Sequence, residues 1–251
     1  MKDTTEKIVA WLQNYSKQSG IETFIVGVSG GIDSALTSTL CAKTGYNTIV
    51  VSMPIHQDPK QLELAHEHIQ WLLSKYENVT AKEKDLTGIF EVFKESFDDT
   101  EKTELALANS RSRLRMMTLY QIAQSNNALV VGTGNKVEDF GVGFFTKYGD
   151  GGVDVSPIAD LMKSEVLLAA KELGVSERII AAPPTDGLWE NNRTDEEQLG
   201  ATYSELEWAM EYDGKEDVSP EKRRVLEVYY ELHNKNMHKM VPIPVCKIKG
   251  V

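Results

Sequence analysis

Apolar residues along this chain fall into short continuous runs and longer stretches at helical spacing. Four runs predict strands, the third of them an edge strand: 24–29, 47–54, 78–85 and 128–133. Helical spacing predicts helices over 4–18, 35–45, 60–76, 86–97, 103–126, 160–173, 176–182, 199–213 and 219–240. Strands that alternate with helices are typical of βαβ units, so we expect an α/β fold: a parallel twisted sheet of about five strands with helices on both faces.

Two stretches lack a clean period. Residues 134–157 contain six glycines, and residues 183–198 are rich in polar residues. Long irregular segments in a compact domain are usually functional. We expect both to close over a site and to become ordered when its ligands bind. No linker composition separates domains, so 1–251 is expected to be a single domain.

The overall charge narrows the class of partners. The formal net charge is −11, which disfavours general binding to nucleic acid. No apolar run approaches the ~20 residues of a membrane span, and no signal peptide is evident, so we expect neither membrane insertion nor export. Cys41 and Cys246 fit no disulfide framework or zinc motif, which favours a reducing cytoplasm.

The sequence VSGGIDSA, residues 28–35, lies between a predicted strand and a predicted helix. Unpaired N–H groups at a helix N-terminus, close backbone approach at glycine and serine hydroxyls together make a cradle for phosphate. The turn lacks the lysine of a Walker A motif and does not match GxGxxG. Asp33 is compatible with phosphate if Mg²⁺ lies between them. The alternative is a turn that uses Gly and Ser for geometry alone.

SGGIDS resembles the pyrophosphate loop of the N-type ATP pyrophosphatases. Further stretches together resemble the ammonia-dependent NAD synthetases: RSRLRM (111–116), GTGNKVED (132–139), FFTKYGDGGVDVSPI (144–158), LMKSEV (161–166), PTDGLW (184–189), TDEEQLG (194–200) and HK (238–239). This resemblance implies an adenine nucleotide α-hydrolase-like fold and a homodimer. It also implies a reaction in which ATP adenylates the nicotinate carboxylate of deamido-NAD and ammonia then displaces AMP. The larger members add a glutaminase domain, for which this chain has no room.

The resemblance also implies roles for individual residues. Those for ATP are Gly27, Val28, Ser29, Gly30, Gly31, Ile32, Asp33, Ser34, Thr133, Lys163 and Thr185. Those for deamido-NAD are Arg115, Lys147, Asp154, His238 and Lys239. The carboxylates implied for Mg²⁺ are Asp33 and Glu138. Lys163, at the ATP phosphates, and Asp150, as the carboxylate that binds ammonium and helps to deprotonate it, are implied to be catalytic.

Each of these residues has a simpler interpretation. Glu138 alone would be an exposed loop carboxylate, Lys163 a solvated lysine and Asp150 part of an Asp-Gly turn. The two threonines could be helix caps or turn residues. Asp186 also departs from the family, which often has alanine there.

Helix 103–126 has more apolar positions than one face needs, which fits burial against a partner or in a deep core. Two rival functions remain: another ATP pyrophosphatase, of the tRNA-modifying or GMP-forming type, and an ATP-binding sensor without turnover.

Overall fold

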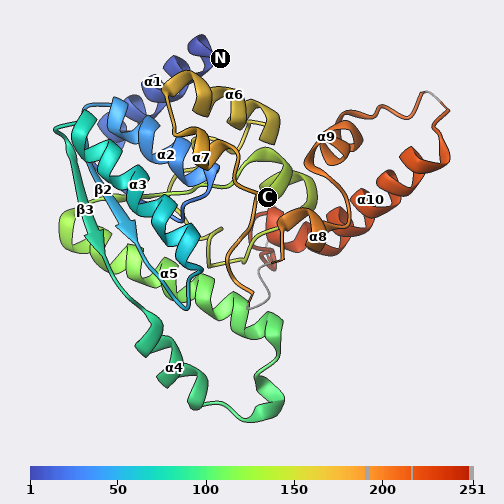
Figure 1. The fold of residues 1–251 in the computed structure, drawn as a ribbon. Helices are drawn as coiled ribbons and strands as arrows, with labels where there is room; N and C mark the ends of the chain where they lie inside the picture. The colour runs from blue at the N-terminus through green and yellow to red at the C-terminus, as the bar shows by residue number, and fades with distance from the viewer. Residues whose placement is uncertain (190–192, 216, 249–251) are drawn as a thin grey trace.

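A parallel four-stranded sheet forms the centre of the molecule (Figure 1). The structure is a computed structural model that describes residues 1–189, 193–215 and 217–248. The strands are β1 (Thr23–Gly27), β2 (Asn47–Ser52), β3 (Val79–Glu83) and β4 (Leu129–Val131), in the order β3-β2-β1-β4. The strands β1 and β4 are neighbours in the sheet but far apart in sequence. The segments that follow these two strands therefore lie at the same edge of the sheet.

Alternate residues of the central strand β1 face opposite layers. Phe24 and Val26 pack with one group of helices, and Ile25 packs with the other. The layer on the side of Phe24 and Val26 consists of α1 (Lys2–Ser19), α2 (Ile32–Lys43), α3 (Pro59–Lys75) and α6 (Lys163–Leu173). The layer on the side of Ile25 consists of α4 (Thr87–Glu95) and α5 (Glu104–Asn126). The strands β1, β2 and β4 are therefore largely buried and are continuous apolar runs, whereas the edge strand β3 is exposed beyond Val79.

A separate apolar cluster lies beyond the carboxyl edge of the sheet. It joins the π-helical turn η2 (Val137–Val142) to α9 (Tyr203–Glu211) and α10 (Pro220–Met240). The remaining short elements are η1 (Asp99–Glu101), α7 (Glu177–Ile180) and α8 (Asp195–Leu199). In Figure 1, α9 and α10 project to one side of the sheet layers. We call α9 and α10 the α9–α10 lobe, and side chains of this lobe lie near the carboxyl ends of the strands.

The α/β class and the helices on both faces are confirmed, with three corrections. The described residues place four strands in the sheet, which are the four predicted runs, rather than about five, and Val155 adds only a single parallel bridge to Val131. The segment 134–157, where no regular element was expected, contains η2. The helix expected from 199 begins only at Tyr203, since Gly200 adopts a left-handed conformation and ends α8 there.

No helix in the described part of the chain is both long enough and apolar enough to cross a bilayer. Residues 190–192, which belong to the second expected loop, lie outside the described residues.

Candidate active site

The turn between β1 and α2 leaves backbone donors open at a helix N-terminus. Gly31 is the N-cap residue of α2, in an extended conformation, and no side chain caps the helix. The hydroxyls of Ser29 and Ser34 instead organise the turn: Ser34 Oγ donates to Gly31 O at 2.9 Å and accepts from Ser29 N at 3.2 Å. The uncapped first turn is positively polarised, so it suits an anion such as phosphate.

Gly30 is required by the backbone of this turn. Its φ is +92°, and a Cβ there would lie 2.4 Å from the carbonyl oxygen of Gln61 in α3. Only glycine combines that φ with so close an approach. Gly30 therefore has a geometric role in the turn, and phosphate binding by the turn stays a prediction.

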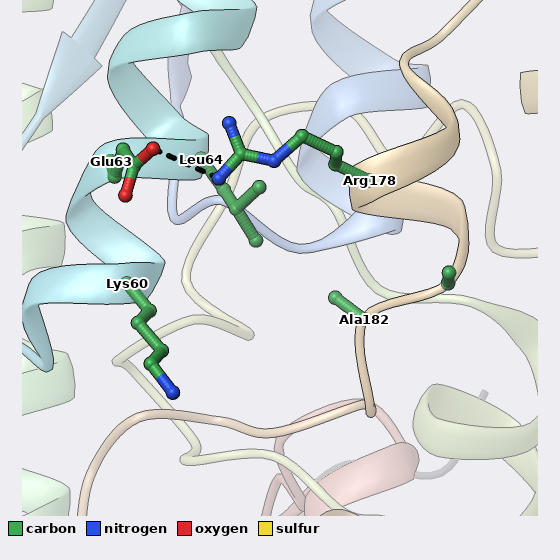
Figure 2. Close-up of a pocket in the computed structure, with 6 residues that line it drawn as sticks. Lys60, Glu63, Leu64, Arg178 and Ala182 are labelled. Atoms are coloured by element: carbon green, nitrogen blue, oxygen red, sulfur yellow. Dashed lines mark hydrogen bonds and ion pairs between the residues drawn. The ribbon is translucent and has the colours of Figure 1, made fainter.

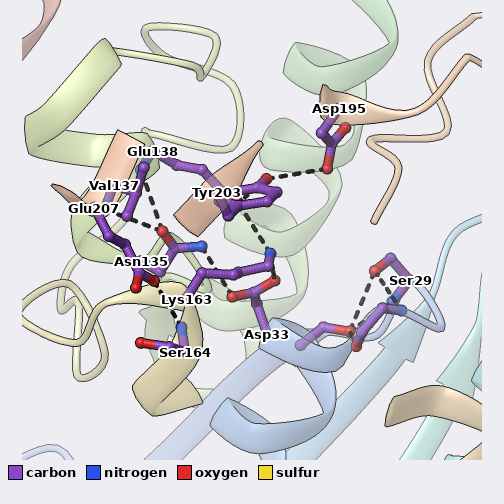
Figure 3. A network of polar contacts seen from close by, with 12 residues as sticks. Ser29, Asp33, Asn135, Val137, Glu138, Lys163, Ser164, Asp195, Tyr203 and Glu207 are labelled. Carbon is purple, nitrogen blue, oxygen red and sulfur yellow. Dashed lines mark hydrogen bonds and ion pairs between the residues drawn. The ribbon is translucent and has the colours of Figure 1, made fainter. Parts of the chain in front are cut away.

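One ammonium joins two carboxylates beside this turn (Figure 3). Nζ of Lys163 donates to Oδ2 of Asp33 at 2.6 Å and to Oε1 of Glu138 at 3.0 Å. The three side chains are 13–18% exposed. They come from the first turn of α2, from η2 and from the start of α6, so the expected meeting of Asp33 and Glu138 is observed.

Asn135 connects these segments. Its Nδ2 donates to Oδ1 of Asp33 at 3.0 Å, while its Oδ1 accepts from the backbone N–H groups of Val137 and Glu138. Asn135 is fully buried. Because one amide engages both Asp33 and the backbone of Glu138, it fixes the distance between the two carboxylate-bearing segments.

The buried charges perturb one another. Burial raises the pKa of Glu138, and the nearby Lys163 opposes that rise. Burial alone would lower the pKa of Lys163, but Asp33 and Glu138 raise it above its ordinary value. Lys163 therefore stays a cation, which is the state needed beside phosphate.

Tyr203 and Asp195 were not among the predicted site residues. The Tyr203 hydroxyl lies 2.6 Å from Oε1 of Glu138 and 3.3 Å from Oδ2 of Asp195, and its ring lies 4.6 Å from Nζ of Lys163. Burial, then the nearby carboxylates, raises the pKa of Tyr203, so its phenol remains a donor. Burial raises the pKa of Asp195 to about 7. TDEEQLGATY carries both residues, but no periodicity singles them out.

The two carboxylates fit a magnesium ion. Asp33 and Glu138 already share one cation, and Mg²⁺ prefers one or two carboxylates completed by phosphate oxygens and water. Among the described residues, no group of three or more His, Cys, Asp or Glu side chains is arranged for metal binding. The donor set therefore suits a metal that arrives with a nucleotide better than a permanently bound one.

Asp150 lies in the turn 147–151, which is held against α5. Its Oδ1 accepts from Ser112 Oγ at 2.6 Å and from Thr146 N at 3.0 Å. Solvent still reaches the residue, but the surrounding protein raises its pKa by desolvation, against the effect of these two hydrogen bonds. Asp150 thus belongs to a structured turn, and its carboxylate is more basic than usual. Ser112 was not among the predicted site residues.

Three of the residues implied for the dinucleotide lie together. Nζ of Lys147 donates to the carbonyl of His238 at 2.8 Å, and Nζ of Lys239 donates to the carbonyl of Phe145 at 2.8 Å. The last turn of α10 therefore contacts residues 145–147. This cluster provides positive charge suitable for a phosphate.

The other two lie elsewhere. Arg115 of α5 donates to Met53 O at the end of β2 and to Gln57 Oε1, each at 3.0 Å. Asp154 accepts from the Tyr120 hydroxyl at 2.9 Å and from Val130 N at 2.8 Å. Both oxygens of Asp154 thus stabilise the surroundings of β4, which is a structural role.

The remaining predicted residues occupy the edges of this region. Gly27 ends β1, Val28 is buried, Ile32 begins α2 and Thr133 follows β4. Thr185 accepts from Gly187 N at 3.2 Å within the loop before α8. A Cβ on Gly187 would lie 2.7 Å from Oε1 of Gln61.

The 185–189 loop is internally bonded through Asp186, the residue that departs from the family. It accepts from the backbone of Leu188, the Trp189 indole and the Gln198 amide. The carbonyl of Leu188 accepts from Arg111 of α5. Asp186 therefore stabilises its loop through three hydrogen bonds.

A hollow of about 380 Å³ lies between α3 and α7 (Figure 2). Its principal cation, Arg178, is already paired with Glu63 at 2.9 Å and with Glu67 at 2.5 Å. These glutamates neutralise the charge that an anion would need. Lys60 is the other cation of the lining, so the hollow has little net positive charge, and the glycine-serine turn with the Asp33–Lys163–Glu138 group remains the candidate site.

Comparison with known proteins assigns this arrangement to a family. The family model described as NAD synthase matches residues 4–242. The chain belongs to the NAD synthase family. The NH(3)-dependent NAD(+) synthetase of Alkaliphilus metalliredigens is 40% identical over 254 residues, covering 97% of each protein.

Two solved structures are also similar to this NAD synthase family member. One is NMN synthetase from Francisella tularensis, with 34% identity, a TM-score of 0.87 and 98% of each chain covered. The other is NH3-dependent NAD synthetase from Campylobacter jejuni in complex with the nitrate ion, with 28% identity, a TM-score of 0.80, and 98% of this chain and 99% of that chain covered.

Proposed function

We propose that this chain is an ammonia-dependent NAD synthetase, a ligase that forms a C–N bond. The nicotinate carboxylate of deamido-NAD attacks the α-phosphorus of ATP, and the bond from that phosphorus to the β,γ-pyrophosphate breaks. Ammonia then attacks the resulting acyl-adenylate, and AMP leaves with the carboxylate oxygen. The observation that carries the proposal is the convergence of an uncapped helix N-terminus with the Asp33–Lys163–Glu138 group in a member of the NAD synthase family.

The turn and Lys163 would act on ATP. The N–H groups at the start of α2 face the anionic triphosphate, and the Lys163 ammonium adds charge where negative charge builds up on the phosphoryl group. Asp33 and Glu138 would hold Mg²⁺, which stabilises the departing pyrophosphate. Asn135 holds the Asp33 carboxylate and the backbone N–H of Glu138 in place before ATP arrives.

Asp150 would handle ammonia. Ammonium has no lone pair, so it must lose a proton before it can attack a carbonyl. Desolvation by the surrounding protein raises the pKa of Asp150, which makes this carboxylate a better base than an aspartate in bulk water. Free ammonia, or ammonia delivered by a separate protein, is the proposed nitrogen source.

The dinucleotide would use the cluster formed by Lys147, His238 and Lys239, in which the two lysine ammonium groups lie beside the end of α10. The guanidinium of Arg115, a residue of α5, lies beside the end of β2. From that position it would contact either nucleotide. For Asp154 we propose an indirect contribution, because both its oxygens are engaged beside β4.

A second candidate acceptor is nicotinate mononucleotide. It deserves a test because one of the similar solved structures, at 34% identity, is described as an NMN synthetase. The chemistry at the carboxylate would be the same, and only the adenosine monophosphate half of the acceptor would differ. We expect kcat/KM to be at least tenfold higher with deamido-NAD, and the reverse order would assign the chain to the mononucleotide.

We further propose a homodimer formed through α4 and α5. Exposed apolar side chains gather on these two helices: Ile89, Val92, Phe93, Leu105 and Met117. Exposed apolar side chains on neighbouring helices are typical of interaction sites. Sedimentation should give a dimer for the wild type and a monomer for Val92→Glu, whereas Leu168→Glu on α6 should remain dimeric; an unchanged dimer with Val92→Glu would remove this interface.

The direct test of function uses ATP, Mg²⁺, deamido-NAD and ammonium. NAD, AMP and pyrophosphate should form in equal amounts, and Asp33→Ala should abolish pyrophosphate release while the protein stays folded. ATP binding without turnover would support the sensor instead. The cytoplasmic location stays a prediction that cell fractionation can test.

A further inference from the structure

Among the described residues, Tyr203 contacts both Glu138 and Lys163 from outside the predicted site. It is the first residue of α9, where Thr202 caps the helix by accepting from Glu205 N. Its ring is 6% exposed and belongs to the apolar cluster of the α9–α10 lobe. A capped helix start and a packed ring fix the hydroxyl in space.

The two bonds to Glu138 end on the same oxygen. Oε1 accepts from Tyr203 at 2.6 Å and from Lys163 at 3.0 Å, so neither bond uses Oε2. A carboxylate held through one oxygen keeps its other oxygen in a fixed direction. Hydrogen bonds of this kind orient metal ligands and raise metal affinity.

Asp195 holds the far side of the phenol. Its backbone N–H donates to Pro184 O at 3.0 Å, and its Oδ2 lies 3.3 Å from the Tyr203 hydroxyl. Asp195 is 5% exposed, and its Oδ1 has no hydrogen-bond partner among the described residues. Burial of a carboxylate with an unpaired oxygen is energetically unfavourable. Its presence next to Tyr203 therefore indicates that the Tyr203 hydroxyl belongs to a polar network rather than to an incidental contact.

We infer that Tyr203 is a positioning residue for the metal centre: its hydroxyl holds Glu138 by Oε1 and leaves Oε2 to the divalent cation, while its ring face holds the Lys163 ammonium. The inference rests on the proposed function, because it treats Glu138 as a metal ligand. It predicts that the hydroxyl and the ring have separable effects, on metal affinity and on Lys163 respectively.

The test is binding of Mn²⁺, followed by electron paramagnetic resonance, in the presence of the α,β-methylene analogue of ATP. Tyr203→Phe removes only the hydroxyl and should raise the Kd for Mn²⁺ at least about tenfold, as loss of a hydrogen bond to a metal ligand usually does. Tyr15→Phe on α1, a half-exposed tyrosine, is the matched control and should change nothing. The KM for deamido-NAD should stay within twofold of wild type in both.

A Kd for Mn²⁺ within twofold of wild type in folded Tyr203→Phe would overturn the inference. If that variant does not fold, 4-aminophenylalanine at position 203 decides. It restores an N–H donor on the same ring and should bind Mn²⁺ within about threefold of wild type, and a tenfold loss would overturn the inference.

The inference and the proposed function can fail separately. NAD formation by wild type together with unchanged Mn²⁺ binding in Tyr203→Phe would reject the inference alone. Weaker Mn²⁺ binding in a protein that forms no NAD would support the positioning role and reject the function.

Discussion

Replacement of Lys163 by methionine should destabilise the protein through the two carboxylates that it leaves unpaired. At the observed distances of 2.6 Å and 3.0 Å, each attraction is worth about 6 kcal/mol with an effective dielectric constant of ~20. Desolvation of the three charges offsets much of this. Removal of one partner of a buried ion pair costs about 3–5 kcal/mol. Since 13–18% of these side chains remains exposed, we expect the lower end, about 3 kcal/mol.

Urea unfolding at pH 7.5 measures this loss directly. The matched control is Lys136→Met, which removes a cation 2.9 Å from Asp160 at a site where the aspartate is 96% exposed. That pair should contribute less than about 1 kcal/mol. Both variants remove one lysine charge, so the difference between them isolates the buried geometry.

The pH dependence adds a second criterion. Without the ammonium, the native-state pKa of Glu138 rises further above its unfolded value, so the native state binds more protons than the unfolded state between the two pKa values. The penalty of Lys163→Met should therefore shrink as the pH falls towards 5. A loss below 1 kcal/mol at pH 7.5, or an equal loss at both pH values, would refute the reasoning.

Three further predictions concern single residues. Gly30→Ala should cost at least about 2 kcal/mol and raise the KM for ATP, because it combines a positive φ with a Cβ 2.4 Å from a carbonyl oxygen; Gly214→Ala, with a similar φ and open space, should cost only about 1 kcal/mol in the same urea titration. Burial raises the pKa of Asp139 to about 8, so the native state binds the extra proton between about pH 4 and 8 and loses stability as the pH rises through that window. Asp139→Asn should therefore raise the Tm by several degrees at pH 8, with a gain that fades towards pH 4; a gain independent of pH would count against the buried charge. Asp150→Asn keeps the turn but removes the base, so pyrophosphate release in the first turnover should persist while NAD formation falls at least tenfold, and equal loss of both steps would contradict the role of Asp150.

Three strands were predictable because they are buried and are read as apolar runs, such as FIVGV and IVV, whereas β3 was predictable only as a weak edge strand. Glycines at 20 and 174 end helices in left-handed conformations. The four predicted runs correspond to β1–β4, and no local pattern located the further strand that a sheet of about five would contain. The turn η2 was missed because a π-helical turn has no characteristic apolar period.

The site was predictable where one local motif carries the chemistry. SGGIDS fixes a strand, a glycine turn and a helix N-terminus within a few residues, and Asp33 lies where that motif implies. Contacts between distant segments were not predictable from pattern alone. Tyr203 reaches Glu138 across 65 residues of sequence, and Asn135 reaches Asp33 across 102. Such pairs depend on how the α9–α10 lobe packs onto the strand ends, which periodicity does not encode.

The most direct test of the adenylation chemistry follows the oxygen of the substrate carboxylate. Deamido-NAD labelled with ¹⁸O in the nicotinate carboxylate is incubated with the protein, ATP, Mg²⁺ and ammonium, and the products are separated and analysed by mass spectrometry. If the carboxylate attacks the α-phosphorus held at the start of α2, each AMP carries one ¹⁸O atom and the pyrophosphate carries none. Label in inorganic phosphate with ADP as the nucleotide product, or unlabelled AMP beside newly formed NAD, would contradict the account.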